Sequence, residues 1–125
     1  NRYKNISCNF FIMSGKQKPF EVKKPWGKFI QFTLNEKTTV KILELKKGEE
    51  TSLQRHKSRN EFWYAIDDGI EVWVKGRKHE LKKGSWISIP KKALHKLVGR
   101  KQGRILEISF GHFDENDIER ISDKY

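Results

Sequence analysis

Short runs of β-branched and aromatic residues, separated by turn residues, occupy the chain from Pro25 onward and restrict it to an all-β fold. Gly, Asn, Asp and Pro interrupt these runs, as is typical of tight turns between strands. The expected strands are residues 26–34, 38–46, 61–66, 70–76, 78–84, 85–90, 95–99 and 103–110. Many short strands at even spacing predict an antiparallel sandwich or barrel.

The two ends of the chain differ from this pattern. Residues 1–23 are polar and basic and are expected to form an N-terminal arm, which leaves residues 24–125 as one barrel domain. Met13 resembles an ordinary protein start, so residues 1–12 are interpreted as an added or upstream extension. The tail is expected to be a short helix over residues 115–122, because Asp114 can cap it and Asp117 follows at the capping-box position.

The charge and the single cysteine restrict partners and location. The formal net charge is +11, which favours an anionic partner such as a phosphorylated small molecule, nucleic acid or an acidic membrane surface. The lysines are scattered and no RNA-binding aromatic–basic signature is visible, so we expect no nucleic-acid partner. No apolar run can span a bilayer, and Cys8 alone cannot form an intrachain disulfide. We therefore expect a cytoplasmic protein.

Four polar residues have the spacing of a metal site. Gln54 and His56 lie two apart, so in an extended strand they point to the same side. Glu61 begins the next strand and can face them across a hairpin, and His95 follows a later turn. Two imidazoles, a carboxylate and an amide oxygen suit Zn, Mn or Fe(II). For the histidines alone, the alternative is an ordinary surface or core residue.

These two segments together resemble the paired motifs of the cupin superfamily. The stretches KPWG, VKILELKKGEETSLQRHKSRNEFW, SWISIPKKALHKL and LEISFGHFDENDIERISDKY are similar to the cupin domain of type II phosphomannose isomerases, from Pro25 to Tyr125. The resemblance implies a double-stranded β-helix, or jelly-roll barrel, with a metal in its mouth. In that family the domain often forms the C-terminal part of a bifunctional enzyme with a guanylyltransferase.

The resemblance also implies the ligand set. Members of this family bind a divalent metal, most often Zn, through Gln, His, Glu and His, which here correspond to Gln54, His56, Glu61 and His95; Mn, Fe or Co are alternatives. The sequence departs from the family at Ser58 and Phe62, which replace histidines, and at Ser109, which replaces glutamine. None of these changes removes a ligand.

Substrate-binding candidates surround the ligands. Arg59 lies at the family's arginine position and is expected to bind the phosphate or hydroxyls, or else to form a salt bridge that steadies the hairpin. Lys91 and Lys92 lie at the barrel rim and can attract phosphate, although solvation alone also explains them. Trp63 shares the phase of Glu61 and can line the sugar site or fill the barrel.

Glu107 and Lys41 are the catalytic candidates. Both match family positions and lie on expected strands, and an inward carboxylate is costly unless it is paired or functional. Glu107 is interpreted as the proton-transfer base and Lys41 as its partner. A buried structural ion pair is the alternative.

The favoured function is interconversion of mannose 6-phosphate and fructose 6-phosphate through an enediol. One alternative is a cupin that binds a sugar or nucleotide sugar without catalysis. Another is a different metal-dependent enzyme, such as an epimerase or dioxygenase. The family resemblance implies a homodimer, and the substrate expected as partner is a phosphorylated sugar.

Overall fold

The computed structural model describes residues 19–122 and contains only strands, turns and loops within them. The strands are β1 (Phe20–Lys24), β2 (Gly27–Gln31), β3 (Thr38–Leu45), β4 (Leu53–Arg55), β5 (Glu61–Ala65), β6 (Ile70–Val74), β7 (Arg77–Leu81), β8 (Trp86–Ile89), β9 (His95–Gly99), β10 (Gly103–Phe110) and β11 (Glu119–Ser122). No helix in this part of the chain is long and apolar enough to cross a membrane. The prediction of an all-β fold is confirmed.

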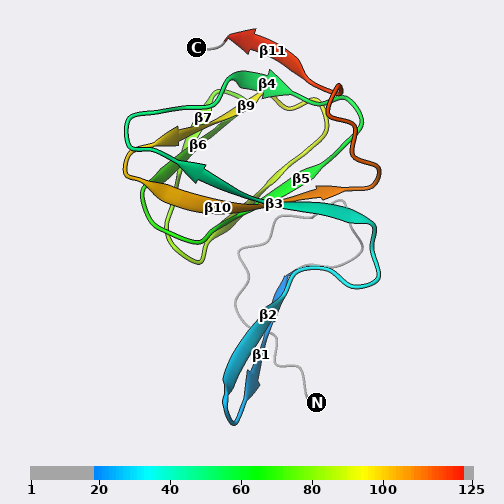
Figure 1. The fold of residues 1–125 in the computed structure, drawn as a ribbon, viewed down its shortest axis with the longest axis vertical. Coiled ribbons are helices and arrows are strands. Elements are labelled where there is room, and N and C mark those ends of the chain that lie inside the picture. Colours follow the sequence, from blue (N-terminus) through cyan, green and yellow to red (C-terminus); the bar gives the residue numbers. More distant parts are fainter. Residues whose placement is uncertain (1–18, 123–125) are drawn as a thin grey trace.

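Two antiparallel sheets form the barrel (Figure 1). One has four strands in the order β3-β10-β5-β8, and the other has five in the order β11-β4-β9-β6-β7. Neighbouring strands in each sheet are often far apart in the sequence, as expected for a jelly roll rather than a simple meander. The arrangement places β4, β9 and β11 at one end of the barrel, where β5 begins in the opposite sheet.

The period-two pattern of the strands determines what lies inside. In β10, Ile105 packs in the cluster between the sheets, whereas Ile108 belongs to a second cluster on the outer face of the four-stranded sheet. Phe62 on β5 is fully buried in that outer cluster, with Phe32 packed over it. Side chains therefore alternate between the two faces of the sheet along β10.

A separate hairpin of β1 and β2 extends from the barrel at the end opposite to β11 (Figure 1). Its turn carries Trp26, whose side chain is 71% exposed. The expected boundary between residues 23 and 24 falls inside β1, so the described part of the predicted arm is strand. Residues 1–18, with Cys8 and Met13, lie outside the described residues.

The predicted C-terminal helix is wrong. Residues 115–116 form a turn, and residues 119–122 form β11, which pairs with β4. Asp114 does accept the N–H of Asn116, as a cap would, but Asp117 directs its carboxylate to the backbone of Lys57 and Ser58. Tertiary hydrogen bonds and the open edge of β4 thus prevail over local helix preference.

The alternation on β10 and β3 predicts unequal costs for one chemical change. Ile105→Ala should lower the free energy of unfolding by about 2–5 kcal/mol, because it leaves a cavity between the sheets. The matched change Ile42→Ala, at a side chain that is 59% exposed on β3, should cost less than about 1 kcal/mol. Urea titration of both variants measures the difference, and equal costs would contradict the inward placement of Ile105.

Candidate metal centre

The two sheets bring four predicted ligands to one cavity. Gln54 lies in β4 and His56 follows it, while His95 begins β9 directly opposite Gln54. Glu61 begins β5 in the other sheet and faces them across the barrel, not across a hairpin as expected. One ligand atom from each of His56, Glu61 and His95 lies within 4.8 Å of the others. All four side chains line a cavity of about 300 Å³.

Glu61 carries a carboxylate that is almost completely buried. Its Oε2 accepts hydrogen bonds from Arg59 Nε at 2.8 Å and from Ser109 Oγ at 3.2 Å. Its Oε1 is buried without a hydrogen-bond partner among residues 19–122 and lies 3.9 Å from His95 Nε2. Because a buried acceptor left unsatisfied is costly, this oxygen indicates a site for a cation.

Both histidines turn the same nitrogen toward the cavity. His56 Nδ1 lies 2.7 Å from the carbonyl of Asp117, and His95 Nδ1 lies 2.9 Å from the carbonyl of Ala93. A carbonyl only accepts, so each Nδ1 carries the proton and each Nε2 is the nitrogen with the lone pair that can bind a metal. The lone pair of His56 Nε2 faces Arg59 Nη2 at 3.3 Å. Burial lowers the pKa of His95, which favours the neutral form that binds metal.

The donor set therefore fits a divalent metal ion. Two neutral imidazoles and one carboxylate are a common set for Zn, Mn and Fe, and Gln54 can add an amide oxygen. Each of the three closest ligands is buried and already oriented by a neighbour, which reduces the cost of assembling the site.

Arg59 lies beside these ligands, but its guanidinium is already engaged. Besides the bond to Glu61, Nη1 donates to the carbonyl of Asp114 at 3.1 Å, and Nη2 lies 3.3 Å from His56 Nε2. The guanidinium also stacks on Phe113, with its carbon 4.4 Å from the ring centre. The side chain is buried, so the structure favours the steadying salt bridge that was the alternative for this residue.

Glu107 and Lys41 face the same cavity from neighbouring strands. They are directly opposite each other in the β10–β3 pair, and Lys41 Nζ lies 4.2 Å from the ring centre of Phe113. Burial and then the charge of Glu61 raise the pKa of Glu107 to about 7, although the charges of Lys41 and Arg59 oppose this. A carboxyl with a pKa near neutrality can both accept and donate a proton at physiological pH.

The remaining predicted residues divide into two groups. Trp63 lines the cavity and contacts the His95 ring edge-on, with ring centres 5.2 Å apart. Lys91 and Lys92 are exposed and are not among the residues that line the cavity. Their backbone N–H groups instead bind Asn60 Oδ1 and the His56 carbonyl, which steadies the loop between β4 and β5.

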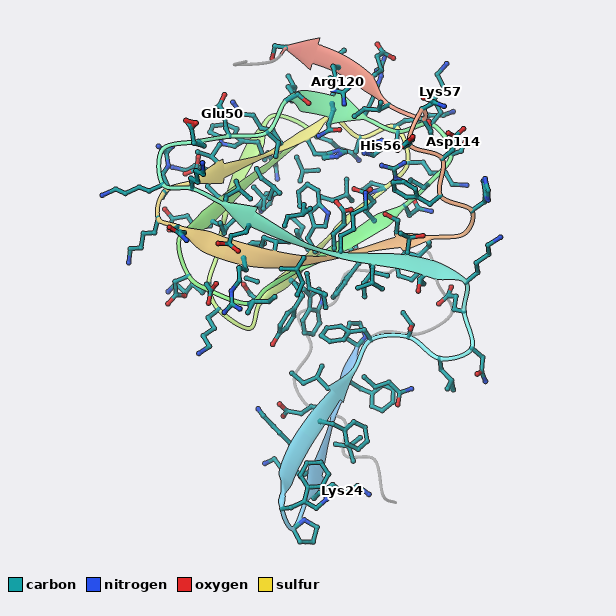
Figure 2. All side chains as sticks on the ribbon, viewed as in Figure 1. Lys24, Glu50, His56, Lys57, Asp114 and Arg120 are labelled. Atoms are coloured by element: carbon teal, nitrogen blue, oxygen red, sulfur yellow. The ribbon has the colours of Figure 1, made fainter. Side chains whose placement is uncertain are left out.

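The C-terminal segment adds cavity residues that the sequence analysis did not assign. Phe113, Glu115, Ile118 and Arg120 all line the cavity. Asp117 accepts hydrogen bonds from the N–H groups of Lys57 and Ser58 with its carboxylate, and its carbonyl contacts His56. His56, Lys57 and Asp114 lie close together at this end of the barrel (Figure 2). The signal was present in the DENDIER stretch that carries the family resemblance, but it was interpreted as a helix.

The whole cupin region matches a known protein family. Residues 14–123 match the family described as Mannose-6-phosphate isomerase C-terminal. The chain belongs to this family. The predicted resemblance is therefore confirmed over nearly all of the chain, including the segment that forms β11.

Relatives of the family member described here are longer proteins. A mannose-1-phosphate guanylyltransferase from Salmonella montevideo is 33% identical over 108 residues, covering 84% of this chain and 23% of the relative. The alginate biosynthesis protein AlgA from Pseudomonas aeruginosa is 30% identical over 115 residues, covering 90% and 24%. The chain thus spans about a quarter of the length of these curated relatives.

Solved structures agree on the fold. KdgF from Halomonas sp. superposes with a TM-score of 0.60 at 15% identity, covering 67% of this chain and 79% of KdgF. A salicylate 1,2-dioxygenase from Pseudaminobacter salicylatoxidans gives 0.56 at 18% identity, covering 58% and 21%. At these identities the likeness identifies a cupin barrel and carries no information on the reaction.

A substitution at Asp117 tests the metal centre without changing any of its candidate ligands. Asp117→Ala removes the acceptor for two backbone N–H groups of the loop that carries His56, so metal affinity should fall about 10- to 100-fold. Asp114→Ala is the matched control, because among residues 19–122 that side chain bonds to Asn116 in its own turn and not to the loop that carries His56. Competition with a chelator measures the affinities. Equal affinities for the two variants would show that Asp117 does not position His56.

The raised pKa of Glu107 predicts how stability depends on pH in metal-free protein. A carboxyl whose pKa rises on folding, here from 4.5 to about 7, stabilises the fold below pH 4.5, and this contribution is lost as the pH rises to about 7. Glu107→Gln cannot ionise. It should match the wild type in Tm near pH 4.5 and exceed it at pH 8 in thermal unfolding with chelator. A constant difference across this range would contradict the assignment.

Proposed function

We propose that the chain is a metal-dependent sugar-phosphate isomerase that interconverts mannose 6-phosphate and fructose 6-phosphate. The observation that supports this most directly is the group of His56, Glu61 and His95 in the cavity that also holds Glu107, a carboxyl with a pKa near 7. Family membership supports the substrate, since the family description names mannose-6-phosphate isomerase.

A divalent ion held by Gln54, His56, Glu61 and His95 would supply Lewis-acid chemistry, polarising the sugar carbonyl and stabilising negative charge on its oxygen. Zn is the metal that we propose first, because two imidazoles and a carboxylate are common zinc ligands. Ser109 and Arg59 hold one carboxylate oxygen of Glu61, which keeps the other directed into the cavity.

Glu107 is the proposed base. In the ionised form it takes the proton from the carbon next to the carbonyl, and the electron pair of that C–H bond forms the enediol double bond. As that double bond forms, the π pair of the carbonyl moves onto O1, and the proton of the O2 hydroxyl passes to O1 directly or through solvent. The carboxyl then returns its proton to C1 while the C2–O2 carbonyl forms, so aldose becomes ketose with no change in composition. Lys41, directly opposite Glu107, keeps a positive charge beside this exchange. Trp63 closes one side of the cavity with apolar surface.

The proposal concerns this domain and not the whole activity of its longer relatives. The two relatives named above are about four times as long as the matched region, so the nucleotide transfer named for the Salmonella relative is not assigned to this chain. A cytoplasmic location and a homodimer remain expectations that accompany the proposal. A sugar-binding cupin without catalysis is the competing outcome of the experiment that follows.

The deciding experiment is a coupled assay for fructose 6-phosphate. Protein stripped with chelator receives mannose 6-phosphate and then Zn, Mn or Co in turn. We expect turnover that depends on the metal, and loss of both bound metal and turnover in His95→Ala. His79→Ala, in β7 and outside the cavity, is the matched control and should keep both. Saturable binding of mannose 6-phosphate by folded, metal-loaded protein without conversion would overturn the isomerase and favour the binding cupin.

A further inference from the structure

We propose that Arg120 binds the phosphate group of the substrate. This inference rests on the proposed function, because it takes a phosphorylated sugar as the ligand. Arg120 lies in β11 and lines the same cavity as the three grouped residues His56, Glu61 and His95. Arg120 and His56 lie at the same end of the barrel (Figure 2). The sequence analysis assigned phosphate binding to Arg59, Lys91 and Lys92, and did not consider this residue.

The register of β11 directs Arg120 toward the metal centre. It pairs with Gln54 across the β4–β11 ladder, and Gln54 in turn pairs with His95. Directly opposite residues on antiparallel strands have side chains on the same face, about 5 Å apart at their Cα atoms. Arg120 therefore belongs to the same inward row as two candidate ligands, and its long side chain extends along the mouth of the cavity.

The other cavity cations have partners that occupy them. Arg59 is buried with its guanidinium nitrogens directed at Glu61, Asp114 and His56. Lys41 lies over the Phe113 ring and opposite Glu107. For Arg120, by contrast, no salt bridge to a carboxylate occurs among residues 19–122, and the side chain is exposed to solvent. A solvated guanidinium at a cavity mouth can exchange water for a phosphate at low cost.

Contacts made by the neighbours of Arg120, and not by its own guanidinium, hold this part of β11 in place. Glu119 forms two hydrogen bonds with Arg55, at 3.1 and 3.0 Å, which fasten β11 to β4. The strand register shifts between Arg120 and Ser122, and pairing continues with Ser122 opposite Leu53, so β11 is held to β4 on both sides of Arg120. Removal of the Arg120 guanidinium should therefore leave β11 in place, which separates a binding role from a structural one.

With Arg120 as the phosphate ligand, the reacting carbons and the phosphate of the substrate bind in different parts of the cavity. The reacting carbons lie near Glu107 and the histidines, whereas the phosphate on the far end of the hexose lies on the β4–β11 side of the mouth. Binding of a remote phosphate holds the reacting carbons in place without taking part in proton transfer. Arg120 thus favours phosphorylated over neutral sugars, and its loss should affect binding more than the chemical step.

The test compares Arg120→Ala and Arg120→Lys with Arg77→Ala, a matched loss of one exposed arginine outside the cavity. In isomerase assays, Arg120→Ala should raise KM for mannose 6-phosphate about 10- to 100-fold with a smaller change in kcat, since hydrogen bonds to charged groups are worth that much. Arg120→Lys should restore part of the loss. Arg77→Ala should behave as the wild type.

Binding measurements on metal-free protein keep the inference independent of turnover. Titration calorimetry with fructose 6-phosphate and with inorganic phosphate should show weaker binding in Arg120→Ala by a similar factor, and fructose should bind all variants alike. If the wild type does not turn over mannose 6-phosphate yet this phosphate-dependent difference persists, only the isomerase proposal fails. Normal KM and normal phosphate binding in Arg120→Ala would overturn the role of Arg120. Wild-type protein that binds neither phosphate compound, whether metal-free or metal-loaded, would overturn both.

Discussion

The ion pair between Arg59 and Glu61 is the interaction on which the rest of this site depends. Glu61 is 2% exposed, and an isolated carboxylate at that depth would be protonated or would destabilise the fold. Arg59 Nε lies 2.8 Å from one of its oxygens and leaves the other free of hydrogen bonds among the described residues. One carboxylate is thereby held in place with its oxygens directed toward both histidines, which is the arrangement that holds a cation.

The same arginine links the metal centre to the C-terminal segment. Its second contact is the carbonyl of Asp114, and its flat face lies against Phe113, so the chain after β10 is held over the cavity. Asp117 then bonds back to the loop that carries His56, by its carboxylate and by its carbonyl. One connected set of polar contacts therefore joins the candidate ligands to the C-terminal segment that lies over the cavity. A substitution in the C-terminal segment is therefore expected to shift the candidate metal ligands even where it contacts none of them.

Sequence could predict the strands of the barrel, and the shared side of Gln54 and His56, because both follow from a period of two. The place of Glu61 is not set by spacing, since it faces the other candidate ligands from the opposite sheet. The tail could not be predicted in this way. Local preference favours a helix there, and only the open edge of β4 and distant N–H groups select a strand.

The predicted phosphate-binding residues show the same dependence on tertiary contacts. Lys92 has a φ of +67°, and this turn directs its N–H to the His56 carbonyl, while its side chain lies outside the cavity lining. Arg59 was correctly expected near the ligands, but the alternative of a salt bridge describes its contacts. The number of Lys and Arg residues in a sequence shows how many cationic side chains are present. It does not show which of them are already paired in the fold. In this fold the ligands come from the two sheets of the barrel, whereas the cation that remains available at the cavity mouth comes from β11, the strand that the sequence did not predict.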